Sequence, residues 1–542
     1  MRKYFIAIAF MSAVGLQAQN VYEIERVSSV DLNGTARSVG MGGAMNALGA
    51  DLSTMSGNPG AMGLYRRSDF ALTASVQTQK GAESFGHQSK TRGSFDQAGM
   101  VYAFQTGSDK VRFVNFGFNY QKTRNLKQFL GSDGWVNLGN HSQLWQLADQ
   151  LAAAAVGFPV VGDDANYPDF NSPVSNGAYD AGLLDIQQIG GIGTDVLSPG
   201  SSEAYRYARA NWGHVNTYDI NLAFNIKDRA YFGVTAGIYE VDMGSCLYYE
   251  EMLQSGGGSL PSYSYGVAED TRLHGTGFDM KFGLVVRPIE ENPFRFGIAF
   301  HTPRMLSLTQ SKWCQFDTTT PIYTTEAVCD ELATGSYDYN IRTPWRLQLS
   351  AATTVSDWLA LDAEYELANC SKTAVKYPNH YTYDGPSLID SDLDLFVEKE
   401  VDYCLRPQHT IRLGAEARFA SNFYGRIGYN FVSSPFKKNA FLNLSPAESE
   451  GDYTEVSNTT YNATSTDYVN LGNTNRLSLG LGWHGKHVYF DAAYILQNQS
   501  AEVYPFSNYE YDSEGYLLGN SMKPFEKDIV RHSALFTFGV KF

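Results

Sequence analysis

Charged and amide side chains, among them arginines able to bind an anionic ligand, concentrate in the middle of this chain. They recur at alternate positions, on the parity opposite to their apolar neighbours: Arg346, Gln348, Asp362, Glu364, Glu366, Arg412, Glu416, Arg418 and Arg426. A guanidinium can hold a carboxylate through two parallel hydrogen bonds. The candidate substrate-binding arginines are therefore Arg346, Arg412, Arg418 and Arg426. The alternative is an internal ladder of ion pairs, because charges on neighbouring strands inside a protein need partners or water.

Other chemistry has no support in the sequence. The histidines stand singly on different segments, and there is no Gly-x-Ser-x-Gly turn or phosphate-binding glycine loop. The five cysteines form no Cys-x-x-Cys pair and no Cys/His cluster with zinc spacing. A formal net charge of −16 argues against nucleic-acid binding, which needs a basic face. We expect no catalytic residue, metal, cofactor or nucleic-acid partner.

The elements that carry the charged residues are strands with period-two alternation. Phe278, Met280 and Phe282, for example, share one face of a segment, whereas Asp279 and Lys281 share the other. Segments of this kind lie near residues 69–79, 95–106, 111–122, 214–226, 229–241, 271–288, 293–310, 341–354, 357–370, 406–420, 422–433, 473–484, 486–499 and 531–542. Aromatic residues make up 14% of the chain, and alternating strands can cross lipid only as a closed barrel. The sequence therefore predicts an all-β fold, a transmembrane antiparallel β-barrel of fourteen strands.

The connections between these segments alternate in length. Tight turns are expected at Gly107–Lys110, Lys227-Asp228, Ser356, Ser421 and Gly485, and the longest loop at 123–213. In bacterial barrels short turns face the periplasm and long loops face outward, and an even strand number brings both ends of the wall to the periplasmic side. The alternating C-terminal segment ends in Phe542 and resembles the signal read by the outer-membrane insertion machinery.

This topology also places the cysteines. Cys314 and Cys329 share one outward loop, and Cys370 and Cys404 stand at the two ends of another. The ends of a loop that returns to the neighbouring strand are about 4.8 Å apart, within the Cα separation that a disulfide accepts. We predict a Cys370–Cys404 disulfide first, a Cys314–Cys329 disulfide second, and Cys246 unpaired; five free thiols are the alternative.

The N-terminal part of the chain has two features. The first eighteen residues have the basic start and apolar run of a secretory signal peptide, with cleavage expected before Gln19. A glycine-rich segment then runs from Asn33 to Leu64, NGTARSVGMGGAMNALGADLSTMSGNPGAMGL. Its small residues suit backbone packed closely inside another structure, and Asn58-Pro59-Gly60 ends it with a turn.

The run from Ala36 to Ala44, with Asp51 and Asn58-Pro59 after it, resembles the N-terminal hatch of the FadL/TodX family of outer-membrane transporters for long-chain fatty acids and other hydrophobic compounds. The usual family ending Asn-Pro-Ala-Gly-Leu is replaced here by Asn-Pro-Gly-Ala-Met. The resemblance implies a hatch, residues 19–68, inside the lumen of a barrel formed by residues 69–542. The hatch residues that it marks are Gly40, Gly42, Gly43, Asn58 and Pro59.

The long loop contains a predicted helix, residues 141–158, with apolar residues at helical spacing. In the resembled family, helices of an outward loop form a first hydrophobic groove for the substrate. The resemblance implies this role for Leu144, Trp145, Leu147 and Leu151. The alternative is an amphipathic lid that covers the barrel mouth and buries the same residues. The acidic run 384–402 is expected to be solvated surface, or to meet lipopolysaccharide through divalent ions.

The function implied by the resemblance is passive uptake of hydrophobic small molecules, long-chain fatty acids by default, across the outer membrane of a Gram-negative bacterium. The expected partners are that substrate, outer-membrane lipid, lipopolysaccharide and the insertion machinery. Two alternatives remain. A structural or docking component for secreted or surface proteins would leave the lumen polar throughout, and a general porin would lack a hatch that seals it.

Overall fold

The computed structural model describes residues 21–542 except 82–88, most of 133–201, 254–262, 320–323, 329–335, 379–390, 394, 439, 442–465, 508 and 512–516. Within 133–201 it describes only short pieces, among them 142–144 and 146–147. The predicted signal peptide, Trp145, Leu151 and Cys329 lie outside the described residues. Among those that are described, no helix is long and apolar enough to cross a membrane.

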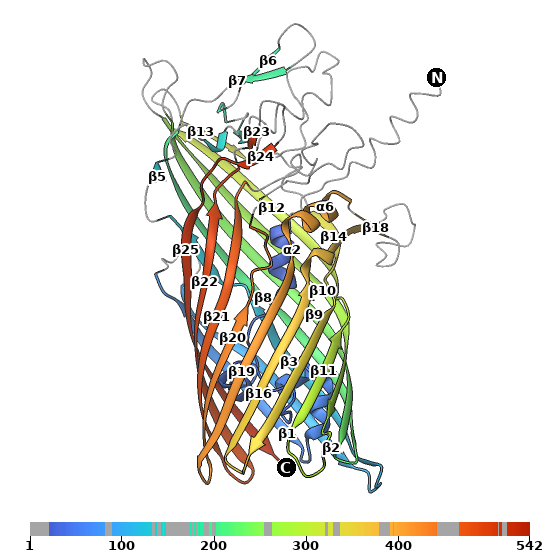
Figure 1. Ribbon diagram of the computed structural model, residues 1–542. Helices are drawn as coiled ribbons and strands as arrows, with labels where there is room; N and C mark the ends of the chain where they lie inside the picture. Colours follow the sequence, from blue (N-terminus) through green and yellow to red (C-terminus); the bar gives the residue numbers. More distant parts are fainter. Residues whose placement is uncertain are drawn as a thin grey trace, which may run out of the picture.

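The chain forms a closed antiparallel barrel whose wall has fourteen strand positions (Figure 1). In chain order the wall consists of β1 (Asp69–Gln79), β2 (Thr91–Gln105), β3 (Val111–Asn125), β8 (Ser202–Ile226), β9 (Ala230–Leu253), β10 (Tyr263–Val286), β11 (Arg295–His301) continued by β12 (Met305–Thr319), β14 (Ser336–Arg342) continued by β15 (Arg346–Val355), β16 (Leu359–Asn369), β19 (Pro407–Ala420), β20 (Phe423–Val432), β21 (Tyr468–His484), β22 (Val488–Tyr504) and β25 (Phe525–Lys541). The last strand pairs with the first, Asp69 opposite Lys541, and closes the ring. The predicted fold class is confirmed.

Two neighbouring wall positions are each broken by a proline. Pro303 separates β11 from β12, and Pro344 separates β14 from β15. Proline lacks the N–H that a ladder needs, so pairing stops there and resumes beyond it. As a result β11 pairs with β15 and β12 pairs with β14.

Shorter elements extend the wall or cover its loop end. They are β4 (Gln128–Gly131), β5 (Val136–Asn137), β6 (Asp185–Gln188), β7 (Thr194–Leu197), β13 (Thr324–Val328), β17 (Ala374–Pro378), β18 (Ser391–Leu393), β23 (Tyr509–Tyr511) and β24 (Leu517–Asn520), with the 3-10 helix η3 (Cys370–Lys372) and the helix α6 (Leu395–Cys404). The tight turns lie together at the opposite end, where β25 also finishes (Figure 1). At two of them Lys227, Asp228 and Ser356 have positive φ angles of 56°, 56° and 50°. The alternation of short turns and long loops is as predicted.

Several strands are longer than their sequence pattern indicates. β8 begins at Ser202 rather than 214, β9 ends at Leu253 rather than 241, and β10 begins at Tyr263 rather than 271. The predicted loop 123–213 is shortened accordingly, because β3 reaches Asn125 and both β4 and β5 pair with β8.

The reason is that hydropathy changes sides along these strands. Near the turn end of β10, the outward Phe282 is apolar and 40% exposed, whereas the inward Lys281 is buried. Near the loop end the outward Arg272 is charged and exposed, whereas the inward Val267 is apolar and buried. Side chains still alternate between the two faces, but toward the loop end the outer face becomes polar and the inner face becomes apolar.

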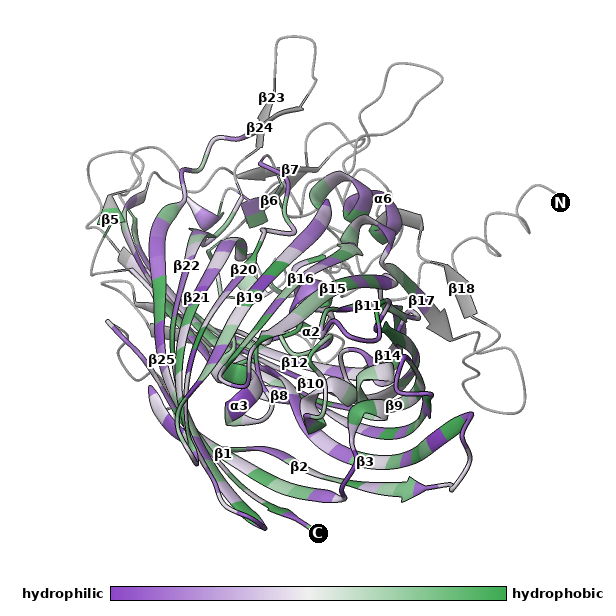
Figure 2. Ribbon diagram, turned by 60° about the horizontal axis from the view of Figure 1, so that its bottom comes forward, coloured by the Kyte–Doolittle hydropathy of each residue, from purple (hydrophilic) through white to green (hydrophobic). Residues whose placement is uncertain are grey.

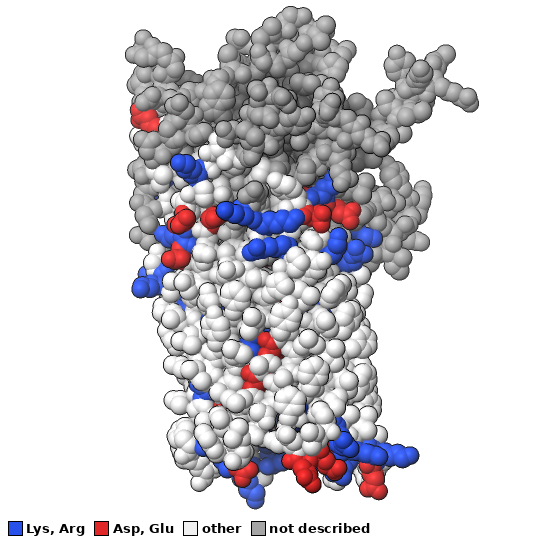
Figure 3. All heavy atoms as spheres, in the orientation of Figure 1, with Lys and Arg blue, Asp and Glu red and all other residues white. Residues whose placement is uncertain are grey.

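The outer surface of the wall follows the same division. Charged side chains gather at two levels, one at the turns and one below the loop region, and the surface between them is almost entirely uncharged (Figure 3). The exposed large hydrophobic residues of this apolar band include Leu72, Phe116, Ile220, Phe282, Phe300, Leu413, Ile427, Leu479, Tyr494 and Phe536.

Two predictions for the loop end are wrong. Cys370 and Cys404 are free thiols, because each contacts its own neighbours: the Cys370 Sγ lies 3.9 Å from the Ala368 carbonyl and the Cys404 Sγ 3.5 Å from the Phe441 carbonyl. The prediction that the acidic run is solvated surface is wrong at Glu400, which is fully buried in the helix α6, whereas Glu398 and Asp402 of the same helix are exposed. Cys314 is disulfide-bonded. Its predicted partner is outside the described residues.

Peptide mapping tests this assignment of the thiols. After alkylation of the unfolded, non-reduced protein, we expect Cys370 and Cys404 to carry the alkyl label and Cys314 to appear in a disulfide-linked peptide. Mass spectrometry of the digest decides the matter. A disulfide-linked Cys370–Cys404 peptide would contradict the structure, in which both thiols are free.

Candidate functional site

The N-terminal segment lies inside the ring of strands. It contains the helices α2 (Val21–Ser28) and α3 (Ala36–Gly40) and the 3-10 helices η1 (Leu52–Met55) and η2 (Pro59–Leu64). α2 lies toward the loop end and the rest of the segment toward the turns (Figures 1 and 2). We call residues 21–68 the hatch. Its short helices start at side chains that accept from their first amides, Thr35 for α3, Asp51 for η1 and Asn58 for η2.

Two carboxylates of β16 hold a turn of the hatch by its backbone. Glu364 accepts hydrogen bonds from the N–H groups of Met45 at 2.8 Å and Asn46 at 2.7 Å. Asp362 accepts from the next two amides, at 3.2 and 3.0 Å. Buried amides cost free energy unless they are paired, so these carboxylates supply what the turn cannot supply for itself.

A chain of polar contacts, most of them ion pairs, ties the hatch to four further strands. Arg37 of the hatch meets Glu416 of β19 at 2.8 Å, Glu416 meets Arg426 of β20 at 2.6 Å, and Arg426 meets Asp491 of β22 at 2.5 Å. His484 of β21 completes the chain at 3.1 Å from Asp491. Arg426 and Asp491 are fully buried. Removing one member of such a buried pair typically costs about 3–5 kcal/mol, because the other charge is left without a partner.

The predicted hatch glycines allow backbone to touch backbone. Gly42 has a φ angle of 68° and lies so close to β20 that a Cβ on Gly428 would be 2.0 Å from the Gly42 nitrogen. Gly43 also has positive φ, at 83°, and a Cβ on Gly40 would be 3.1 Å from Gly480 of β21.

The turn at Asn58-Pro59 docks in the same way on β9 and β10. A Cβ on Gly233 would lie 2.2 Å from the Pro59 carbonyl oxygen, and one on Gly283 would lie 2.1 Å from Asn58 Oδ1. The Asn58 amide also donates to the Leu284 carbonyl at 3.2 Å. The wall thus carries glycines opposite the hatch motif, a complement that the hatch sequence alone does not reveal.

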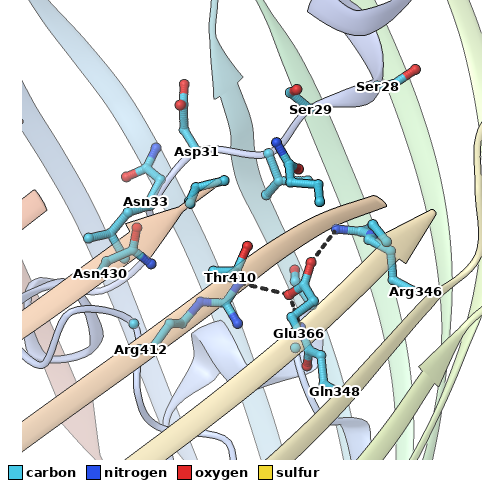
Figure 4. Close-up of a pocket in the computed structure, with 18 of the residues that line it drawn as sticks. Ser28, Ser29, Asp31, Asn33, Arg346, Gln348, Glu366, Thr410, Arg412 and Asn430 are labelled. Atoms are coloured by element: carbon cyan, nitrogen blue, oxygen red, sulfur yellow. Dashed lines mark hydrogen bonds and ion pairs between the residues drawn. The ribbon is translucent and has the colours of Figure 1, made fainter. Parts of the chain in front are cut away.

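A polar cavity of about 130 Å³ remains between the hatch and the wall. Figure 4 shows the hatch residues Ser28, Ser29, Asp31 and Asn33 on one side and the wall residues Arg346, Gln348, Glu366, Thr410, Arg412 and Asn430 on the other. Both arginines turn toward Glu366, Arg412 at 2.7 Å and Arg346 at 3.7 Å. Because Arg412 also lies 3.4 Å from Glu364, its charge is shared between two carboxylates.

The four predicted arginines therefore separate into three settings. Arg346 and Arg412 face the polar cavity together. Arg426 belongs to the buried ion-pair chain, the arrangement that the ladder alternative describes. Arg418 is exposed near the turn end of β19, where its N–H donates to the Trp358 carbonyl. The spacing of the four arginines in the sequence shows that they share one face of the wall. It does not show which carboxylates they contact.

The loop half of the lumen is filled by apolar and aromatic side chains. They form one contiguous cluster that includes Tyr22, Ile24, Tyr205, Tyr207, Tyr239, Val241, Tyr249, Tyr265, Val267, Phe316, Tyr339, Phe436, Tyr468 and Phe506. We call it the upper apolar cluster. Sequence reasoning missed it, although the change of sides in the alternation of β8, β9 and β10 was a readable signal.

Leu144 and Leu147 of the long loop are fully buried in this cluster. The same loop is held by polar contacts, since Tyr265 of β10 donates to Gln143 at 3.1 Å and Gln143 donates to Thr466 at 2.6 Å. This placement fits the lid alternative for these two leucines better than an open groove.

The comparisons with known proteins add the following. No protein-family model matches the sequence, and no curated protein matches it. Solved structures do match. They include a Pseudomonas aeruginosa FadL homologue, 13% identical with a TM-score of 0.47 over 95% of this chain and 99% of that one, and the Ralstonia pickettii toluene transporter TbuX, 13% identical with a TM-score of 0.45 over 94% and 99%. The Pseudomonas putida toluene transporter TodX matches at 13% identity and a TM-score of 0.43 over 95% and 99%. The strand pairing of this chain itself shows a closed barrel of fourteen strand positions, the fold class that the sequence predicts.

Replacing Gly428 by alanine tests the close contact between hatch and wall. The added Cβ would overlap the Gly42 nitrogen, so we expect a loss of about 1–3 kcal/mol, the usual cost of overpacking. Gly425→Ala on the same strand is the matched control, because its Cβ would meet nothing nearer than 3.7 Å. The measurements are the denaturant midpoint and the protease sensitivity of the hatch. Equal values for both variants would mean that the hatch does not contact β20 at Gly428.

Proposed function

We propose that this protein is a channel for the passive uptake of hydrophobic small molecules across the outer membrane. The single observation that carries the proposal is the composition of the lumen. Its turn half is polar and occupied by the hatch, whereas its loop half is filled by the buried side chains of the upper apolar cluster. Apolar surface inside a barrel has no role in passing ions or sugars, but it stabilises an apolar solute that leaves water.

The apolar band supports the location. Outer-membrane barrels carry an outward apolar band of about 25 Å between two polar edges, and the face of the wall shown in Figure 3 has an almost uncharged band between two charged levels. Its turn end would face the periplasm. The C-terminal strand is proposed to be read by the insertion machinery, and lipid and lipopolysaccharide to surround the wall.

The proposed path follows the lumen from the loops to the hatch. An apolar compound enters the upper apolar cluster past the lid residues Leu144 and Leu147, and reaches the polar cavity beside Arg346 and Arg412. Passage beyond this cavity needs movement of the hatch, which blocks the lower lumen. Long-chain fatty acids are the default substrate, since an apolar chain suits the cluster and a carboxylate suits a guanidinium.

The two alternatives differ from this proposal at the lumen. A docking component or a general porin does not need inward apolar residues such as Val267, which is completely buried within the upper apolar cluster. A general porin also does not need a hatch held by buried ion pairs. The channel proposal accounts for both features with one function.

A charge in the apolar band tests the membrane location. Phe282 of β10 is 40% exposed within the band, and Thr276 of the same strand is exposed beyond it toward the loops. Phe282→Arg should destabilise the inserted barrel by about 2–4 kcal/mol, and Thr276→Arg by about 0–1 kcal/mol. Refolding into lipid vesicles at graded urea concentrations measures both. Equal effects would place the lipid elsewhere.

A charge in the lumen tests the substrate class. Val267→Asp puts a carboxylate in the upper apolar cluster, whereas Ala268→Asp puts one on the outer face of the same strand. Because an unpaired charge disfavours an apolar neighbour, we expect uptake of a fluorescent hydrophobic probe into vesicles to fall tenfold or more for Val267→Asp only. Heat-modifiable migration checks that both variants fold. Unchanged uptake by a folded Val267→Asp variant would refute the apolar path.

A further inference from the structure

Four arginines surround a second, smaller cavity between the hatch and the wall. Arg26 comes from α2, Arg124 from β3, Arg476 from β21 and Arg531 from β25. Asp31 of the hatch is the only carboxylate among the residues that line this cavity. We call these five residues the arginine cage. Asp31 and Arg476 also line the first cavity, whereas Arg26, Arg124 and Arg531 line only this one.

Both carboxylate oxygens of Asp31 already have partners. Its Oδ1 lies 3.1 Å from Arg476 and 3.6 Å from Arg124, and its Oδ2 accepts from the Asn125 N–H at 3.0 Å. Arg26 and Arg531 make no ion pair with any residue that the structure describes. The cage therefore keeps a formal excess of three positive charges.

These charges are not relieved by water at the surface. Arg26, Arg476 and Arg531 are only 9%, 5% and 7% exposed. Arg26 Nη1, Arg124 Nε and Arg531 Nε are buried donors without an acceptor among the described residues. Burial, together with the neighbouring guanidinium of Arg209, lowers the pKa of Arg26 to about 10.

The nearby carboxylates Asp467 and Glu23 favour the charge of Arg26 but form no ion pair with it, and each already has another partner. Asp467 is paired with Arg209 at 2.5 Å, and Glu23 lies 3.6 Å from Lys312 and accepts from Gln310. Uncompensated buried charge is expensive, and each buried donor without an acceptor adds to that cost.

We infer that the arginine cage binds one small anion, which bridges α2 to β3, β21 and β25. The cavity offers about 30 Å³, which suits a halide ion or a single carboxylate group. The amides of Gln128, Gln497 and Gln499 complete its polar lining. A bound anion would accept hydrogen bonds from guanidinium groups that belong to four different elements of the chain.

The anion has two possible sources with the same chemistry, a free ion from solution or the carboxylate of a bound amphiphile. The site itself does not depend on which substrate the channel carries. It has a mechanical consequence, because the anion would add to the ion pairs of Asp31 a second link between the hatch and the wall, through Arg26 and Arg531.

Bromide is the direct probe. Crystals of the detergent-solubilised protein soaked in sodium bromide should give an anomalous peak within hydrogen-bonding distance of the Arg531 and Arg26 guanidiniums. A parallel soak with a bromine-tagged medium-chain carboxylate distinguishes the source. Carboxylate density in the cage, with bromine in the upper apolar cluster, assigns the anion to an amphiphile, and a bromide peak alone assigns it to solution. An empty cage in both crystals overturns the inference.

Variants test the same site in solution. The unfolding midpoint of the wild type should rise with bromide relative to gluconate at equal ionic strength, and Arg531→Gln or Arg26→Gln should lower the apparent bromide affinity tenfold or more. In gluconate, Arg531→Gln should be at least as stable as wild type, because it relieves repulsion. Arg272→Gln is the control, since Arg272 is exposed beside Asp270 on the outer face. The same bromide response in all four proteins overturns the inference.

Discussion

Carboxylates on the inner face of the wall hold the hatch, and the rest of the lumen depends on that contact. A segment with little regular structure has many amides that no helix or ladder pairs. Asp362 and Glu364 accept four of them, and Glu416 takes the charge of Arg37. The strands around the hatch must therefore be polar inside, although their outer faces are apolar. Hatch and lower lumen are in this sense one polar core.

The loop half of the lumen does not have to pair the amides of the hatch, and its inner face is apolar instead of polar. Where β8, β9 and β10 extend beyond the apolar band, their outer faces become polar and their inner faces become apolar. The helix α2 follows this change, since Val21, Tyr22 and Ile24 pack in the upper apolar cluster, whereas Arg26 reaches the arginine cage. One barrel thus contains an apolar zone at its loop end and a polar zone, occupied by the hatch, at its turn end.

Much of the wall could be predicted from the sequence because one face of each strand is continuously apolar. The segment 69–79 is recovered to the residue, and the turns at Lys227-Asp228 and Ser356 lie where the pattern breaks. The extensions of β8, β9 and β10 could not be found by the same test, because their apolar residues move to the inner face. The thiols of Cys370 and Cys404 were misassigned because loop ends that lie near each other need not direct their side chains together.

The charged residues of the lumen were identified by parity, but their roles depend on partners far away in the chain. Arg426 and Arg412 look equivalent in the sequence. In the structure the first is locked between Glu416 and Asp491, whereas the second faces a cavity. The arginine cage brings together residues as far apart in the sequence as Arg26 and Arg531. At such a separation, spacing along the chain does not predict which residues lie close together.

Uptake by the proposed path requires that the upper apolar cluster receives hydrophobic compounds. The most direct test is a crystal structure of the protein grown with a bromine-labelled aliphatic hydrocarbon that carries no charge. Anomalous peaks should appear among Tyr249, Tyr265 and Val267, inside the barrel and on the loop side of the hatch. Peaks confined to the outer apolar band, with the cluster unchanged, would contradict it.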